Sequence, residues 1–170
     1  RAREAGVDFF ISKPIFQSVV QDVLLKATRR RQSADTLPVQ KEDFAGRRIL
    51  LVEDNEINME IARTLLEFRN ASVDGACNGQ QAVEMFRSSP QNHYDAVLMD
   101  VRMPVMDGIA ATQAIRGLDR ADAATVPILA MTANAFAEDI ERSRKAGMNE
   151  HLAKPIEPET LYARLASYFR

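Results

Sequence analysis

Five side chains that can handle a phosphoryl group or a divalent cation stand directly after apolar runs of the sequence. They are Glu53, Asp54, Asp100, Thr132 and Lys154. If the runs are parallel strands of one sheet, their carboxyl ends share an edge, and the crevice at that edge is where open α/β sheets bind ligands. Three acids, a hydroxyl and a lysine gathered there indicate chemistry on phosphate with a divalent metal.

The three acids predict the kind of metal. Carboxylates held close together repel one another and raise each other's proton affinity, so a site built from Glu53, Asp54 and Asp100 calls for a cation. Ligands that are all oxygen favour Mg²⁺ over zinc, and Mg²⁺ keeps room for water and for a phosphate oxygen. We therefore expect Mg²⁺ as the cofactor.

Asp100 is the best placed of the acids to act as a nucleophile. It ends an apolar run, and residues 103–108 after it have the composition of a turn, which leaves its side chain exposed before the next helix. A carboxylate in this position can accept a phosphoryl group and form an aspartyl phosphate. The Lys154 ammonium and the Thr132 hydroxyl would then surround the transferred group.

Hydrophobic periodicity predicts the elements that position these residues. Strands are expected at 48–53, 72–77, 96–100, 126–131 and 150–153. A helix is expected after each strand: from about 57 to 68, around 82–86, at 108–116, from about 135 to 145 and from about 158 to 169. Strict alternation of this kind predicts an α/β fold with a five-stranded parallel sheet covered by helices on both faces.

An internal repeat suggests how the chain is organised. Shifted by 141 positions, residues 1–6 match residues 142–147, and Lys13-Pro14-Ile15 matches Lys154-Pro155-Ile156. We therefore interpret residues 1–31 as the last strand and helix of an upstream unit, 32–46 as a polar linker and 47–170 as a complete domain. The fragment 1–31 is expected to find a substitute partner, as in a dimer or a swapped arrangement.

Composition excludes several classes. A net charge of -2 over 170 residues argues against a nucleic-acid surface. The single cysteine cannot form an internal disulfide, and no apolar stretch reaches the roughly 18 residues of a membrane helix. We expect a cytoplasmic segment that makes no membrane contact itself and is cut from a longer protein, whose other parts could include a membrane anchor.

Four short segments resemble the signature motifs of response-regulator receiver domains from two-component systems. They are Glu53-Asp54-Asn55, the run from Asp100 to Gly108, the run from Met131 to Ala135, and Lys154-Pro155-Ile156. The upstream repeat resembles multi-receiver hybrid sensor histidine kinases, so the parent chain is expected to be a hybrid kinase. The segment itself is expected to be a phosphoacceptor rather than a turnover enzyme. The resemblance implies a flavodoxin-like, doubly wound sheet with strand order 2-1-3-4-5.

The resemblance also implies roles for individual residues. Asp100 would receive a phosphoryl group from a phosphohistidine donor, either a histidine kinase or a histidine phosphotransfer domain. Glu53, Asp54, Asp100 and the main-chain carbonyl of Arg102 would bind Mg²⁺. Thr132 would move toward the phosphoryl group, Lys154 would pair with it, and the peptide bond before Pro155 would be cis.

One position departs from the family pattern. Receiver domains often carry Tyr or Phe three residues before the site lysine, where this chain has His151. That ring and Thr132 would form the conformational switch. We expect the imidazole to pack at the strand edge, and a pH-sensitive switch is the alternative.

Three other functions fit parts of the pattern. A receiver that is never phosphorylated would act as a protein interaction module. A phosphohydrolase resembling haloacid dehalogenases needs a second acid two residues after the nucleophile, where this chain has Arg102. A flavin carrier would need neutral hydrogen-bond donors for the flavin phosphate after the first strand. This chain has the acids Glu53 and Asp54 there.

Overall fold

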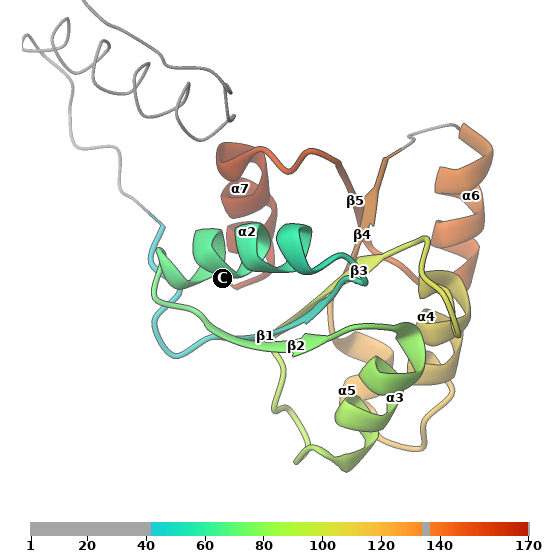
Figure 1. The fold of residues 1–170 in the computed structure, drawn as a ribbon. Helices are drawn as coiled ribbons and strands as arrows, with labels where there is room; N and C mark the ends of the chain where they lie inside the picture. Colours follow the sequence, from blue (N-terminus) through green and yellow to red (C-terminus); the bar gives the residue numbers. More distant parts are fainter. Residues whose placement is uncertain (1–41, 134–136, 170) are drawn as a thin grey trace, which may run out of the picture. The chain divides into compact units, whose positions relative to one another are not determined.

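The computed structural model describes residues 42–133 and 137–169. Five parallel strands form one sheet in the order β2-β1-β3-β4-β5 (Figure 1). The strands are β1 (Arg48–Val52), β2 (Ser72–Ala76), β3 (Ala96–Asp100), β4 (Ile128–Thr132) and β5 (Glu150–Ala153). This order and the parallel pairing confirm the predicted fold class.

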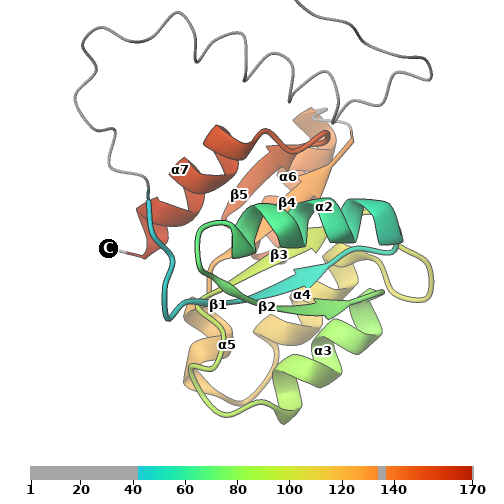
Figure 2. The same ribbon diagram turned by 60° about the vertical axis from the view of Figure 1, so that its left-hand side comes forward.

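Helices cover both faces of the sheet. They are α2 (Glu56–Glu67), α3 (Gly79–Ser88), α4 (Gly108–Arg116), α5 (Ala121–Thr125), α6 (Ala137–Ala146) and α7 (Pro158–Tyr168). Helices α2 and α7 lie on one face, and α3, α4, α5 and α6 lie on the other (Figures 1 and 2). The arrangement is what right-handed crossovers between parallel strands require.

Each face of the sheet has its own hydrophobic core, because successive residues of a strand point to opposite faces. In β1, Leu50 and Val52 join the core under α3 and α4. Ile49 and Leu51 join the core under α2 and α7. All residues of β3 and β4 are buried, as expected for central strands of a parallel sheet.

The strand register aligns the carboxyl ends of the inner strands. Val52 lies opposite Met99, Asp100 opposite Met131, and Thr132 opposite Ala153. Residues that end or follow these strands therefore meet at one edge of the sheet. Polar caps begin the helices that leave this edge: the side chains of Asn55 and Asp107 accept hydrogen bonds from backbone amides in the first turns of α2 and α4.

Two elements differ from the sequence-based expectation. The structure contains an additional helix, the five-residue α5, between α4 and β4. In addition, β4 begins at Ile128 rather than Val126. Pro127 lacks an amide hydrogen and cannot donate to a sheet ladder, which accounts for the later start.

The predicted fragment 1–31 and most of the predicted linker 32–46 lie outside the described residues. Phe44, within the linker range, is buried and packs edge-to-face against Phe169 and Tyr162. Over the part of the chain that the structure describes, none of the helices is both long enough and apolar enough to cross a membrane.

Candidate phosphoacceptor and metal site

Three acidic side chains converge at the carboxyl edge of the sheet. One carboxylate oxygen from each of Glu53, Asp54 and Asp100 lies within 4.8 Å of those of the other two. Glu53 and Asp100 are buried, whereas Asp54 is exposed. The expectation that the Asp100 side chain is exposed was therefore wrong, because Lys154 and Glu53 lie against its carboxylate. The cluster is thus buried at Glu53 and Asp100 and open to solvent at Asp54. Its donor atoms are all oxygen, which fits Mg²⁺.

Lys154 lies between the two buried acids. Its ammonium donates to Glu53 Oε2 at 2.5 Å and to Asp100 Oδ2 at 2.6 Å. The backbone of Lys154 is joined to β4, because its amide donates to the Thr132 carbonyl at 2.8 Å. The Lys154–Pro155 peptide bond is cis. The structure therefore brings Lys154 to the acids, with the cis bond that the resemblance implied.

The other oxygens of the two buried acids also accept hydrogen bonds. Asp100 Oδ1 accepts from the Arg102 amide at 3.1 Å. Glu53 Oε1 accepts from the Asn58 side-chain amide at 3.1 Å and, more weakly, from the Asn55 amide at 3.4 Å. Sequence analysis did not identify Asn58. This residue lies in the first turn of α2, after the Asn55 cap, and its side chain reaches Glu53 at the end of β1.

The electrostatics of the site follow from burial and pairing. Burial raises the pKa of the Asp100 carboxyl, and hydrogen bonds from Lys154 and Arg102 offset only part of this effect. The repulsion from Glu53 that we expected also raises the Asp100 pKa, but it is the smallest of these causes. Burial alone would lower the Lys154 pKa, yet the two carboxylates together raise it, so the ammonium stays charged.

The predicted switch residues lie on neighbouring strands. Thr132 is buried at the end of β4, and His151 lies in β5 opposite Ala130. The His151 ring is partly exposed, but its Nε2 atom is buried and has no hydrogen-bond partner among the described residues. Burial lowers the pKa of this imidazole. The ring therefore packs at the strand edge largely in its neutral form.

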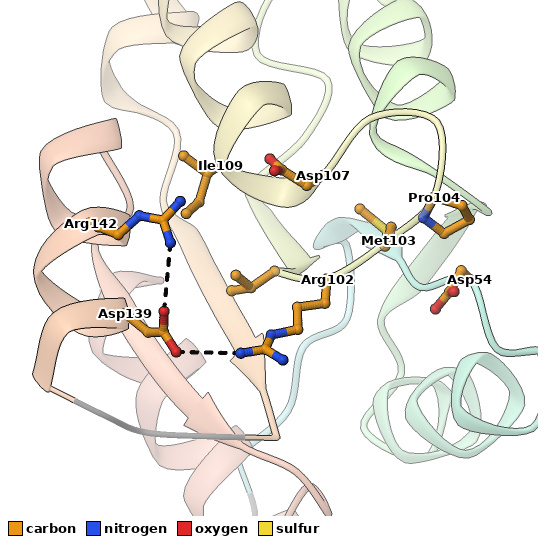
Figure 3. A pocket seen from close by; sticks show the side chains of 9 residues that line it. Asp54, Arg102, Met103, Pro104, Asp107, Ile109, Asp139 and Arg142 are labelled. Atoms are coloured by element: carbon orange, nitrogen blue, oxygen red, sulfur yellow. Dashed lines mark ion pairs between the residues drawn. The ribbon is translucent and has the colours of Figure 1, made fainter.

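An open pocket of about 560 Å³ adjoins the acid cluster. It is lined by Asp54, by residues of the β3–α4 loop and by Asp139 and Arg142 of α6. Arg102 and Arg142 approach the Asp139 carboxylate from two sides (Figure 3). Sequence analysis did not assign Asp139 or Arg142 to the site, because neither belongs to a signature segment and only the fold brings α6 beside this loop.

The fold and site define a receiver domain. Residues 49–166 match the family model of the response regulator receiver domain, and the chain belongs to this family. It is a phosphoacceptor module of two-component signalling with an acidic cluster suited to Mg²⁺.

Curated relatives show in which kind of protein similar domains occur. It is 33% identical over 168 residues to the signal transduction histidine-protein kinase BarA of Escherichia coli, an alignment that covers 99% of this chain and 18% of BarA. The chain spans 9% to 18% of the length of BarA and of five further curated relatives. These relatives include hybrid sensor histidine kinases, and the similarity is to their receiver regions.

Two solved structures are informative about the site. The receiver domain of a sensor histidine kinase from Pseudomonas aeruginosa PAO1, with a magnesium ion coordinated in its active-site cleft, is 41% identical and has a TM-score of 0.66; the match covers 73% of this chain and 98% of that one. A co-crystal of the Saccharomyces cerevisiae phosphotransfer protein Ypd1 with the receiver domain of Ssk1 gives 31% identity and a TM-score of 0.64, covering 72% of this chain and 88% of that one.

Proposed function

We propose that Asp100 accepts a phosphoryl group from a phosphohistidine donor. The observation that carries this assignment is the placement of Asp100 at the end of the central strand β3, 2.6 Å from the Lys154 ammonium and beside two further acids. An Asp100 oxygen attacks the phosphorus, the phosphorus–nitrogen bond breaks, and the imidazole leaves with the bonding electron pair. The Lys154 ammonium lies where it can neutralise charge on the phosphoryl oxygens.

Glu53, Asp54, Asp100 and the Arg102 main-chain carbonyl would hold Mg²⁺. When bound, the ion neutralises the acids and offers a coordination position to a phosphoryl oxygen. The carboxylate separation within 4.8 Å supports this assignment, as does the magnesium bound by the Pseudomonas relative.

Thr132 and His151 are proposed as the switch that reports phosphorylation. Thr132 ends β4, which pairs with β3, and His151 lies in β5, which pairs with β4. The donor is proposed to be a histidine kinase or a histidine phosphotransfer domain, in line with the Ypd1 complex of the Ssk1 receiver domain. We place the domain in the cytoplasm as the receiver part of a hybrid kinase, with residues 1–31 as the end of a preceding receiver domain.

Intact-mass spectrometry after incubation with acetyl phosphate and Mg²⁺ tests the assignment. The wild-type protein should gain the mass of one phosphoryl group, and Asp100→Asn should gain none. Glu56→Gln is a matched control, because Glu56 is an exposed acid three residues beyond Glu53 and lies outside the cluster. An adduct that persists in Asp100→Asn would show that another residue is the acceptor.

A further inference from the structure

The side chain and the backbone of Arg102 connect to different parts of the molecule. Its amide donates to Asp100 Oδ1 at 3.1 Å, inside the acceptor site. Its guanidinium reaches away, and its Nη2 lies 3.6 Å from Asp139 Oδ2 on helix α6 (Figure 3). The loop that follows the acceptor is therefore joined to α6 by one charged side chain.

Asp139 is the better fixed member of this pair. Its side chain is 26% exposed, whereas that of Arg102 is 71% exposed. The second oxygen of Asp139 lies 3.8 Å from Arg142 Nη1, one turn along the same helix. Asp139 therefore stays with α6, and Arg102 is the long, exposed side chain that is free to change partners.

A phosphoryl group on Asp100 would offer Arg102 such a new partner. The phosphoryl group carries close to two negative charges on three acceptor oxygens, against the single charge of Asp139. Because the Asp100 carboxylate loses its own charge when it bonds to phosphorus, the net gain two residues from Arg102 is about one negative charge. Arg102 and Asp54 also line the same pocket, so Arg102 and the open side of the acid cluster border one space.

We propose that Asp139 is a positioning residue that holds the Arg102 guanidinium on α6 and competes for it with the phosphoryl group on Asp100. The inference rests on the proposed function. In the unphosphorylated domain the Arg102–Asp139 pair links the β3–α4 loop to α6. On phosphorylation Arg102 exchanges the carboxylate for phosphoryl oxygens, and α6 loses this link.

The competition predicts that removing the Asp139 charge strengthens binding of a phosphoryl mimic. The probe is beryllofluoride, which occupies a carboxylate as a tetrahedral analogue of a phosphoryl group, with Mg²⁺ present and ¹⁹F NMR reporting the bound fraction. Asp139→Asn should lower the half-saturating concentration about two- to fivefold, the range that an exposed ion pair supports. This gain in affinity should be smaller in about 1 M salt, where the Debye length is only about 3 Å.

Three further variants separate this role from a structural one. In an Arg102→Ala background, Asp139→Asn should have no effect on the half-saturating concentration, because there is no guanidinium left to release. Asp139→Glu should behave as wild type, because it keeps the charge. Glu141→Gln is the matched control: Glu141 is an exposed acid on α6 that pairs with Lys145 at 2.7 Å.

The outcomes distinguish this inference from the proposed function. Unchanged or weaker beryllofluoride binding by Asp139→Asn, or an equal gain with Arg102 absent, would overturn the competition while leaving Asp100 as the acceptor. Failure of the wild-type protein to bind beryllofluoride, or equal binding by Asp100→Asn, would instead reject the acceptor assignment itself.

Discussion

Asp100 is a buried acid, and its burial makes the ionised form of the carboxyl less favourable in the folded domain than in water. It is 6% exposed, and burial raises its pKa despite the ammonium and the amide that hydrogen bond to it. A reactive carboxylate is expected to have this property, because functional sites commonly give up stability for chemistry.

Replacing Asp100 with asparagine should therefore stabilise the metal-free domain. The expected gain in the free energy of unfolding is on the order of 1 kcal/mol near neutral pH, because a buried charge is removed and Lys154 keeps Glu53 as a partner. Urea denaturation with a chelator present measures it. The exposed Asp54→Asn should change stability by less than about 0.5 kcal/mol.

The gain in the free energy of unfolding from Asp100→Asn should depend on pH, and the raised pKa of Asp100 sets the direction. Because the folded-state pKa of Asp100 is raised above 3.8, its contribution favours folding at low pH and is lost as pH rises through the folded-state value. The difference between variant and wild type should thus grow from about pH 4 to about pH 7. A difference that is largest at acid pH would contradict the raised pKa.

At the scale of elements, Gly108 sets how closely α4 approaches the end of β3. A Cβ atom at this position would lie 2.1 Å from the Asp100 carbonyl oxygen and 2.9 Å from Met99 Cγ. The first contact is with backbone, which cannot move aside without displacing the acceptor strand. Only glycine allows the helix to begin here at this distance.

Gly108→Ala should destabilise the domain by about 2 kcal/mol or more, because the overpacked contact moves backbone. It should also lower the rate of phosphoryl uptake from acetyl phosphate, because Asp100 shifts with the strand end. Gly117→Ala, at the other end of α4, is the matched control: its φ is -83°, and its nearest contact would be at 3.4 Å. Equal losses in both variants would show a general cost of alanine rather than a clash at the site.

The sequence predicted the strands and the larger helices well, because their apolar periodicity is carried by buried residues. It did not predict α5, since five residues are too few to show a helical period. Arg120 forms a local pair with Asp122 at 2.7 Å. It also ties this helix to α3 by a tertiary contact, because its Nη1 donates to the Phe86 carbonyl at 2.6 Å. Such contacts depend on segments that are distant in sequence.

At the scale of the molecule, the site exists only when the sheet is formed. Its residues span positions 53 to 154, and strand order and register alone bring them to one edge. Motif spacing was enough to predict that Glu53, Asp54, Asp100 and Lys154 lie together. It was not enough to show which oxygen each donor contacts, because this depends on side-chain conformations set by packing.

Mg²⁺ should stabilise the whole domain, because only the folded chain holds the three acids together. At a concentration about 100 times the dissociation constant, the expected gain is about 2.7 kcal/mol, seen as a higher midpoint of thermal unfolding. Asp54→Ala should lose most of this shift while keeping its metal-free stability, because Asp54 is exposed. KCl at matched ionic strength controls for screening. An equal Mg²⁺ shift in Asp54→Ala would remove Asp54 from the site.

Because Lys154 contacts both buried acids, it also affects how a divalent cation could enter the site. With one oxygen of Glu53 and one of Asp100 on its ammonium, the lysine serves as the internal counter-ion of the acid cluster. A divalent ion that bound through either of these oxygens would have to displace the ammonium from it, and the oxygen would exchange a singly charged partner for a doubly charged one. The ammonium would stay close to Asp100, where it could pair with an incoming anion such as a phosphoryl group.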